Sequence, residues 1–193
     1  MNNSKSAIFL DRDGTINTLN GYISEFEQIQ IIEGVPEAIC LFNKLGFLVI
    51  VVTNQPVIEM ELISKADLEN LHQRITLEIM KKGGHIDAFY YCPHIEVPKE
   101  SINMGTHSCS CRKPRVGLIK KAVEAYNVDL TRSYMIGDTW RDVDLAKNVG
   151  LNYFKICDST VPDNPQGNFV ESLLEAALII EKRLNGDVEF LNA

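Results

Sequence analysis

The chain has 193 residues, of which 45% are hydrophobic and 23% charged, proportions typical of a soluble globular protein with one full core, so we expect a single domain over residues 1–193. Its net charge of −7 argues against nucleic acid or an anionic membrane as the main partner. No apolar run approaches the roughly 20 residues of a membrane span, and no apolar secretory segment follows Met1, so we expect a cytoplasmic protein and, by default, a monomer.

Strand-like and helix-like segments alternate along the chain. In chain order we predict a strand over 7–10, a helix over 35–45, a strand over 47–52, a helix over 64–82, a strand over 88–92, a helix over 114–126, a strand over 134–137, a helix over 141–149, a strand over 152–156 and a helix over 168–184. The strands are continuous apolar runs, which is typical of strands buried on both faces. The helices carry apolar residues at helical spacing between capping residues.

Two helix starts have specific capping signals. Ser64 with Asp67 has the spacing of an acidic capping box, and Asn168 with Glu171 has the same spacing before the last helix. The alternation of elements predicts an α/β fold, Rossmann-like, with a parallel sheet covered by helices on both faces. No insertion between the elements is large enough for a cap domain.

Polar side chains follow three of the predicted strands. Asp11 and Asp13 follow the first, Thr53 and Asn54 end the second, and Asp138 follows the fourth. Ligands of such folds bind at the carboxyl ends of the strands, so these side chains are predicted to meet at one site. For the two aspartates alone, a solvated turn is an equally good interpretation, because Asp and Gly are common turn residues. The coincidence of three strand ends favours a site.

This set of groups suits phosphoryl transfer. Asp11 could attack a phosphate and form an aspartyl-phosphate, while Asp13 could protonate the leaving oxygen and later activate water. Mg²⁺ binds one or two carboxylates together with phosphate oxygens. Thr53 and Lys113 could hold the phosphate.

A second candidate site lies in the long loop between residues 92 and 111. Cys92 and His94, followed after fourteen residues by Cys109 and Cys111, offer three sulfur ligands and one nitrogen. This is a closed tetrahedral set suited to structural Zn²⁺, which would order a loop otherwise long for a compact domain. The alternative is four unrelated residues, and His107 is a competing nitrogen ligand.

These motifs resemble those of a known superfamily. The matching segments are FLDRDGT (9–15), VVTNQ (51–55), RKP (112–114) and IGD (136–138) with Asp142. In this order and over almost the whole chain, they resemble the four motifs of the haloacid dehalogenase superfamily. Within it, the DRDGTIN segment, Gly21-Tyr22, the YYCPH segment and CSCRKP resemble the histidinol-phosphate and heptose-bisphosphate phosphatases.

The resemblance implies a Mg²⁺-dependent phosphatase that acts on a small phosphorylated sugar. It implies that Asp11 is the nucleophile and Asp13 the general acid/base. It places Mg²⁺ on Asp11, Asp138 and the backbone carbonyl of Asp13. It favours His94 as the nitrogen ligand of zinc. The other two histidines, His72 and His85, are expected to be ordinary helix or surface residues.

The resemblance also implies how the phosphate and substrate are held. Thr53, Asn54 and Lys113 would bind the phosphoryl group, and Arg112 would contact the rest of the substrate. Thr15 would support the motif. Asp142 would orient Lys113 or support the metal, although an acid in the first turn of a helix also stabilises the helix dipole.

The sequence departs from the family pattern at two places. Family members usually carry Ser-Gly-Ile-Ala-Arg-Gly after TNQ, where this chain has Pro-Val-Ile-Glu-Met-Glu (56–61), and usually Lys at the position of Thr139. Both changes remove a positive charge expected near a phosphorylated sugar. Two alternatives therefore stay open beside the heptose substrate: a histidinol-phosphate phosphatase, and a non-catalytic binding protein.

Overall fold

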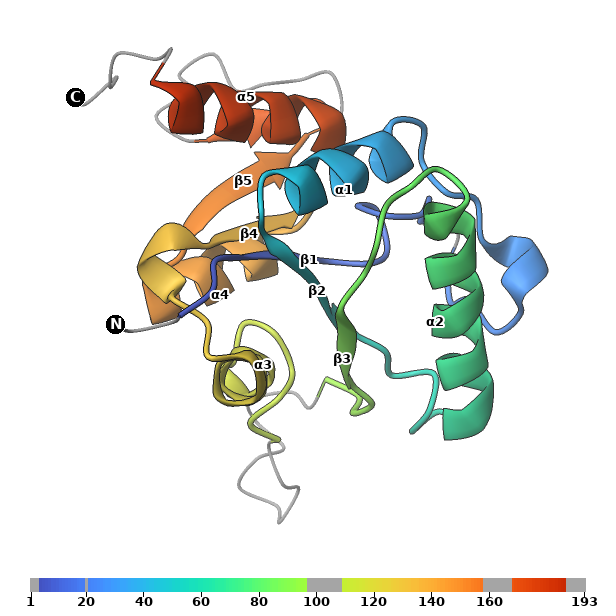
Figure 1. The fold of residues 1–193 in the computed structure, drawn as a ribbon. Helices are drawn as coiled ribbons and strands as arrows, with labels where there is room; N and C mark the ends of the chain where they lie inside the picture. The colour runs from blue at the N-terminus through green and yellow to red at the C-terminus, as the bar shows by residue number, and fades with distance from the viewer. Residues whose placement is uncertain (1–3, 20, 97–108, 158–167, 187–193) are drawn as a thin grey trace.

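The computed structural model describes residues 4–19, 21–96, 109–157 and 168–186. Six parallel strands form one sheet in the order β3-β2-β1-β4-β5-β6 (Figure 1). The strands are β1 (Ala7–Leu10), β2 (Leu48–Asn54), β3 (Ala88–Cys92), β4 (Tyr134–Gly137), β5 (Asn152–Ile156) and β6 (Phe169–Val170). The first strand of the chain is thus central, and the order reverses beside it, where ligands of such sheets bind.

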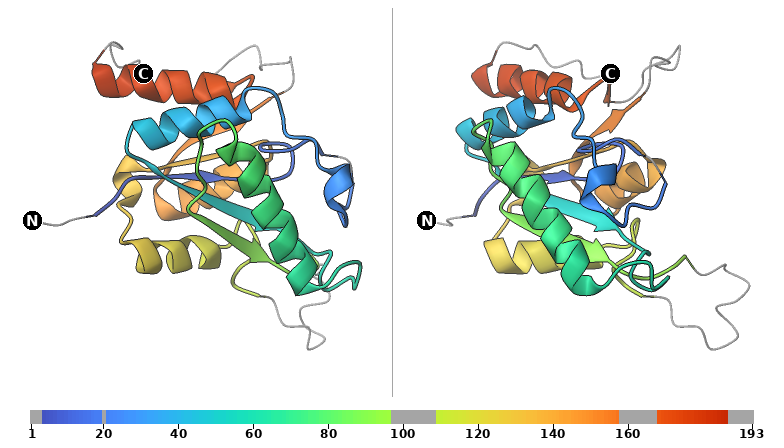
Figure 2. Two further views of the ribbon diagram at one scale, coloured as in Figure 1. Left: turned by 45° about the vertical axis from the view of Figure 1, so that its right-hand side comes forward. Right: turned by 90° about the vertical axis from the view of Figure 1, so that its right-hand side faces the viewer.

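Helices cover both faces of the sheet. They are α1 (Val35–Lys44), α2 (Lys65–Met80), α3 (Gly117–Tyr126), α4 (Trp140–Val149) and α5 (Leu173–Asn185), with short 3-10 turns at η1 (Phe26–Gln28) and η3 (Leu130–Arg132). Helices α1, α2 and α5 pack on one face, and α3 and α4 on the other. Figure 2 shows α1 and α5 side by side, with α3 across the sheet from them.

Alternate residues of β1 face the two halves of the core. Ile8 and Leu10 pack into the cluster that holds α1, α2 and α5, whereas Ala7 and Phe9 pack into the cluster that holds α3 and α4. All four are fully buried. The continuous apolar run therefore has the two-sided burial expected of a parallel strand, and the predicted fold class is confirmed.

The last helix begins later than predicted. Residues 169–170 pair with β5 as the edge strand β6, and the N-cap is Ser172, whose side chain accepts a hydrogen bond from the Glu175 amide. The capping box predicted at Asn168 and Glu171 is therefore wrong, because those residues flank a strand. The box at Ser64 and Asp67 is confirmed.

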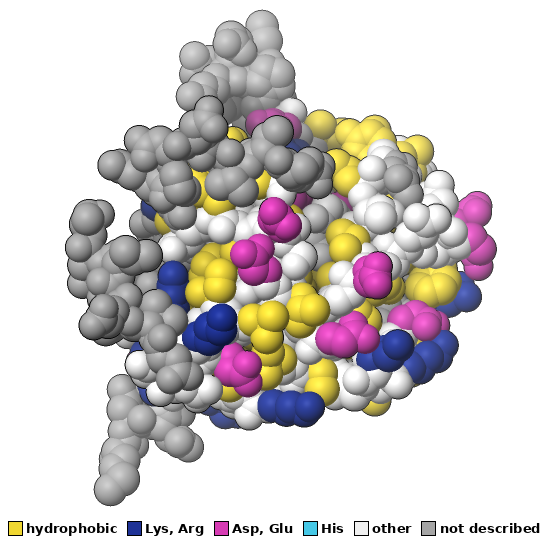
Figure 3. Space-filling model, turned by 90° about the horizontal axis from the view of Figure 1, so that it is seen from above, with side chains coloured by type: hydrophobic (Ala, Val, Ile, Leu, Met, Phe, Trp, Pro, Cys, Tyr) yellow, Lys and Arg dark blue, Asp and Glu magenta, His cyan; other side chains and the backbone are white. Residues whose placement is uncertain are grey.

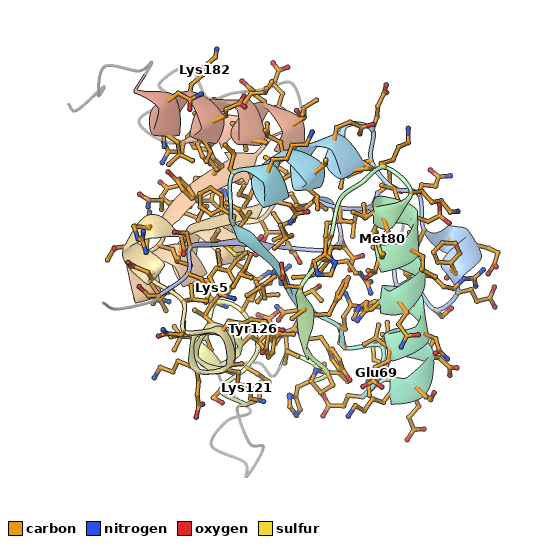
Figure 4. All side chains as sticks on the ribbon, viewed as in Figure 1. Lys5, Glu69, Met80, Lys121, Tyr126 and Lys182 are labelled. Atoms are coloured by element: carbon orange, nitrogen blue, oxygen red, sulfur yellow. The ribbon has the colours of Figure 1, made fainter. Side chains whose placement is uncertain are left out.

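Helix α3 also begins later, at Gly117 instead of residue 114. The Arg115 amide donates to the Arg112 carbonyl at 2.9 Å, and the Gly117 amide to the Ser110 carbonyl at 3.0 Å, so the segment before the helix is a compact turn. At the other end of α3, the Tyr126 hydroxyl donates to the carbonyl of Asp87 at 3.2 Å and ties the helix to the start of β3 (Figure 4).

The surface is of mixed charge. On the face seen in Figure 3, acidic and basic side chains are interspersed with hydrophobic ones, without an extended basic patch among the described residues. Within the described part of the chain, none of the helices has the length and hydropathy to cross a membrane.

Candidate active site

The carboxyl ends of β1, β2 and β4 meet at one hollow. Leu10 pairs with Val51 on one side and Ile136 on the other, so Asp11, Thr53 and Asp138 follow at neighbouring positions of the sheet edge. All three line a hollow of about 630 Å³, together with Asp13, Asn54, Arg112 and Lys113. The structure thus brings together the residues that the sequence predicted for the phosphate site.

Lys113 is the buried cation of this site. Its Nζ lies 2.8 Å from Oδ1 of Asp11 and 2.7 Å from Oδ1 of Asp142, with only 3% of the residue exposed. Burial alone would lower the pKa of Lys113, but the two carboxylates outweigh it and raise the pKa above its ordinary value. The ammonium therefore stays charged, which would suit the binding of a phosphate.

The negative charge of an ionised Asp11 is only partly compensated by its neighbours. Burial raises the pKa of Asp11 to about 7, and Lys113 only partly opposes this shift. Both Lys113 and the Arg12 amide contact Oδ1, so among the described residues no hydrogen bond falls on Oδ2. Asp11 is therefore placed to present Oδ2 to a phosphorus atom or to a cation.

Asp138 supplies the other half of a cation site. Its buried Oδ1 has no hydrogen-bond partner within the described part of the chain, and burial raises the pKa of Asp138. A side chain at Gly14 would place Cβ 2.2 Å from Oδ2 of Asp138, so only glycine, here at φ +80°, leaves room for this carboxylate. Carboxylate oxygens of Asp11, Asp138 and Asp142 lie within 4.8 Å of one another. An all-oxygen set with an unpartnered buried oxygen fits Mg²⁺.

Asp142 makes contacts that fit two of the interpretations left open by the sequence, a helix cap and a partner of Lys113. It is the third residue of α4, where its Oδ2 accepts hydrogen bonds from the Thr139 hydroxyl at 2.6 Å and the Thr139 amide at 3.2 Å. Its Oδ1 accepts from Lys113 Nζ. Gly137 leaves the space for it, since a Cβ there would lie 2.4 Å from Oδ2. The helix cap therefore also orients Lys113.

Thr53 and Asn54 are positioned by different partners. The Gln55 side-chain amide donates to the Thr53 hydroxyl oxygen at 3.0 Å, which leaves the hydroxyl hydrogen free to point elsewhere. Asn54 accepts from the Lys113 amide at 2.9 Å and donates to the Lys113 carbonyl at 3.3 Å. Asn54 thus holds the backbone of Lys113 while also lining the hollow.

Asp13 is held by three neighbours. Its carboxylate forms a bidentate ion pair with Arg12, at 2.9 Å and 2.8 Å, and accepts from Asn17 at 3.0 Å and Gln55 at 2.7 Å. Thr15, in the same turn, is buried, and its hydroxyl has no hydrogen-bond partner among the described residues.

The cysteine and histidine residues also come together. The distances from Cys92 Sγ are 3.6 Å to Cys109 Sγ, 3.2 Å to Cys111 Sγ and 3.4 Å to His94 Nδ1, and Cys111 Sγ lies 3.3 Å from His94 Nδ1. Sulfur ligands at 2.3 Å from a tetrahedral zinc lie about 3.8 Å apart. The four ligand atoms lie within 4.8 Å of one another, so the cluster is compatible with a zinc site, although its sulfur atoms are somewhat closer together than in a filled one. The competing ligand, His107, lies outside the described residues.

Charged residues surround the mouth of the hollow. Glu96 lies 3.6 Å from both Arg112 and Arg141, so these two cations share one exposed carboxylate. In the segment that departs from the family pattern, the Glu59 carboxylate accepts a hydrogen bond from the Ile95 amide. That segment therefore contacts the chain that leads away from His94.

Four residues that contact Asp13 or its partner Arg12 had no role predicted from the sequence. Arg12, Asn17 and Gln55 were quoted only as parts of motifs, and His72 was expected to be an ordinary helix or surface residue. His72 is indeed on α2, but it is only 4% exposed. Its Nε2 lies 3.4 Å from Arg12 Nη1. A histidine on the apolar stripe of α2, between Leu71 and Ile75, was the available signal.

The parallel fold and this acid–lysine site define a hydrolase of the haloacid dehalogenase class. Residues 110–155 match a family model described as HAD-hydrolase-like. The D-glycero-beta-D-manno-heptose-1,7-bisphosphate 7-phosphatase of Escherichia coli K12 is 38% identical over 152 residues, covering 78% of each chain. The enzyme of the same name from Pasteurella multocida is 32% identical over 182 residues, 92% of this chain and 97% of the relative. The chain belongs to the heptose-bisphosphate phosphatase family of haloacid dehalogenase-like phosphatases.

Solved structures agree on the fold. A putative HAD-like phosphatase from Mesorhizobium loti superimposes with a TM-score of 0.79 at 26% identity, over 94% of this chain and 88% of that one. The D,D-heptose 1,7-bisphosphate phosphatase of B. bronchiseptica, determined with magnesium and phosphate, gives 0.76 at 24% identity, over 95% and 99%.

Proposed function

We propose that the protein is a Mg²⁺-dependent phosphatase that releases one phosphate from D-glycero-D-manno-heptose 1,7-bisphosphate. The single observation that carries the chemistry is the buried contact of Lys113 with Asp11, at the sheet edge where Asp13 and Asp138 also lie. The heptose substrate is supported by the names of the relatives.

Each side chain has a step that its geometry suits. Asp11 Oδ2 attacks the phosphorus, and the phosphorus–oxygen bond to the sugar breaks as Asp13 protonates the departing oxygen. Lys113 and the Thr53 hydroxyl hold the phosphoryl oxygens as charge shifts onto them. Asp13 then takes a proton from water, which attacks the aspartyl-phosphate and releases inorganic phosphate.

The bound Mg²⁺ would neutralise the charge between the phosphate and the carboxylates. The side chains of Asp11 and Asp138, with the backbone carbonyl of Asp13, would hold it. The raised pKa values of Asp11 and Asp138 support this assignment, because an oxygen-bound cation favours the ionised carboxylates.

A zinc ion in the cysteine and histidine cluster would be structural. Four protein ligands leave no open position for water or substrate. Arg112 and Lys113 follow Cys111 directly, and the Arg112 guanidinium donates to the His94 carbonyl at 2.8 Å. The ion would therefore fix the segment that carries both cations into the hollow.

The second phosphate of the substrate suits the mouth of the hollow. Arg112 and Arg141 supply two positive charges there, which Glu96 offsets in part, although Thr139 and the 56–61 segment lack the family's expected cations. A bisphosphate can therefore place one phosphate at Asp11 and the other near these arginines.

A phosphate-release screen with Mg²⁺ tests the assignment. We expect release from the heptose bisphosphate, with one phosphate removed per molecule and little activity on histidinol phosphate. Release from histidinol phosphate but not from the heptose would overturn the substrate. Absence of release from every compound tested, with Mg²⁺ bound, would favour the non-catalytic interpretation.

A further inference from the structure

The carboxylate of Asp13 has a full set of donors. Oδ1 accepts from Arg12 Nε and Asn17 Nδ2, and Oδ2 accepts from Arg12 Nη2 and Gln55 Nε2. An ionised carboxylate offers about four acceptor positions, so these four donors fix both its place and the plane in which it lies. When Asp13 carries the proton that it donates, one of the two neutral amides, of Asn17 or Gln55, has to release its oxygen, while the Arg12 fork can stay in place. The Arg12 fork contributes most to that orientation, because two parallel hydrogen bonds define a plane.

Arg12 is buried and contacts His72 as well as Asp13. Only 1% of it is exposed, and its remaining terminal nitrogen, Nη1, lies 3.4 Å from Nε2 of His72. The His72 ring stacks on Phe89 with centroids 4.3 Å apart and planes 13° apart, and meets Tyr91 edge-on at 5.9 Å. Burial, and then the charge of Arg12, lower the pKa of His72 to about 3, so the ring is neutral. Nε2 therefore accepts from Arg12, and the ring proton lies on Nδ1.

We propose that Arg12 and His72 are positioning residues that orient Asp13 toward the leaving oxygen of the substrate. Helix α2 and strand β3 fix the His72 ring, His72 fixes the Arg12 fork, and the fork fixes the acid/base carboxylate. The inference rests on the proposed role of Asp13 in proton transfer. Neither Arg12 nor His72 is among the described residues that line the hollow, so neither touches the substrate.

A purely stabilising role explains these contacts less well. Buried ion pairs contribute little to stability compared with apolar residues of similar volume, because desolvation of both charges offsets their attraction. Proton transfer, in contrast, depends on orientation, and a displacement of about 1 Å can cost roughly a hundredfold in rate. The arrangement therefore suits the rate of proton transfer better than the stability of the fold.

Two substrates with different leaving groups separate these roles. The sugar oxygen of the heptose bisphosphate needs a proton as the phosphorus–oxygen bond breaks, whereas p-nitrophenolate leaves p-nitrophenyl phosphate without one. We expect His72→Leu to lower kcat/KM on the heptose bisphosphate, which reports formation of the aspartyl-phosphate, by roughly 10- to 100-fold. We expect a much smaller loss of kcat/KM on p-nitrophenyl phosphate. The comparison uses kcat/KM because hydrolysis of the aspartyl-phosphate needs Asp13 with either substrate.

The conservative variant is His72→Gln, whose amide oxygen can still accept from Arg12. We expect it to recover most of the activity on the heptose bisphosphate that His72→Leu loses. Ile75→Val, buried on the same helix, is the control for packing and is expected to leave the ratio unchanged. If His72→Leu does not fold in a thermal melt, Arg12→Lys replaces it, since lysine keeps the charge but has no fork.

Equal losses on both substrates in His72→Leu or its replacement would overturn the inference, as would a His72→Gln variant without rescue. Asp13→Asn separates this failure from failure of the proposed function. If Asp13→Asn loses activity selectively on the heptose bisphosphate while the His72 and Arg12 variants do not, Asp13 is the acid and the positioning role is wrong. If Asp13→Asn lowers kcat/KM on both substrates alike, the acid role itself is wrong.

Discussion

The molecule places two candidate metal clusters near one hollow, and they are built in opposite ways. The oxygen cluster of Asp11, Asp138 and Asp142 lies at the ends of buried strands and the first turn of α4, with Lys113 already paired to two of its members. In the sulfur cluster, Cys92 ends β3, but His94 is exposed and Cys109 and Cys111 lie in a loop. The parallel sheet fixes the first cluster, whereas a bound metal would have to order the second.

The two clusters are expected to differ in how far their local structure depends on a bound metal. The acids of the first cluster are held by hydrogen bonds from the backbone and from Thr139, so we expect that cluster to survive removal of its ion. The second cluster is held on its loop side by the turn before α3 and by the Arg115 side chain, which donates to the Cys109 carbonyl, while Lys113 is held separately by Asn54, Asp11 and Asp142. Removal of its ion would therefore loosen the cysteine and histidine ligands and Arg112 more than Lys113. Variants of the two clusters therefore separate loss of chemistry from loss of local order.

The largest effect is expected in the first cluster. Asp11→Asn removes the nucleophile, and we expect turnover of the heptose bisphosphate to fall by roughly 10⁴-fold or more. The fold remains, because Lys113 keeps its contact with Asp142. Phosphate release and a thermal melt measure the two outcomes, with the exposed Asp144→Asn as the charge-matched control. Retained activity would show that Asp11 is not the nucleophile.

A smaller loss is expected when Lys113 is left with one carboxylate. Asp142→Asn removes the charge that orients its ammonium, and we expect kcat to fall by roughly a hundredfold. Thr139→Val breaks the helix cap but keeps the ion pair, so it is expected to cost about 1 kcal/mol of stability with a smaller loss of turnover. Equal losses of turnover in both variants would show that the cap, and not the ion pair, is what matters.

Loss of the sulfur cluster is expected to act indirectly. We expect about one zinc per chain by metal analysis, and its loss in Cys109→Ser. Activity is expected to fall by roughly 10- to 100-fold as Arg112 and the turn that precedes Lys113 become less well positioned. Cys40→Ser, on α1 and outside the cluster, is the control and is expected to keep its zinc. Zinc-free protein with full activity would contradict the structural role of the metal.

The oxygen cluster also predicts a dependence of stability on pH. The folded pKa of Asp11, about 7, lies above its ordinary 3.8, so its contribution to stability is present below pH 3.8 and is lost as pH rises through 7. Mg²⁺ favours the ionised carboxylate, so we expect it to raise the melting temperature more at pH 8 than at pH 5. Melts of Asp11→Asn are expected to lose most of that difference, and an equal Mg²⁺ effect at both pH values would argue against this site.

The two clusters were predictable from the sequence for different reasons. Asp11, Thr53 and Asp138 each follow an apolar run, and the parallel topology then places them together. Cys92, Cys109, Cys111 and a histidine were predicted from spacing and ligand chemistry, and His94 was preferred to His107 because it matches the family pattern. In both cases each site residue lies within or directly after the short segment whose pattern predicted it.

The surroundings of Asp13 were not predictable in the same way. His72 is sixty residues from Arg12 in the sequence, and their contact depends on how α2 packs across β3. The start of the last helix was wrong for a related reason, because pairing of Phe169 with β5 overrides a local capping pattern. Long-range packing of this kind has no signature in one segment of sequence.

The smallest effect is expected far from both clusters. Ser172→Ala removes the side-chain acceptor for the Glu175 amide, 3.1 Å away, at the start of α5, and we expect a loss of about 1 kcal/mol of stability. For a chain of this size, that loss lowers the melting temperature by roughly 2–4 °C. Turnover and zinc content are expected to stay unchanged, because α5 packs on α1 and not on either cluster. Asn168→Ala is the matched comparison. A larger loss of stability in Asn168→Ala than in Ser172→Ala would indicate that the helix is capped at Asn168, as predicted from the sequence, and not at Ser172.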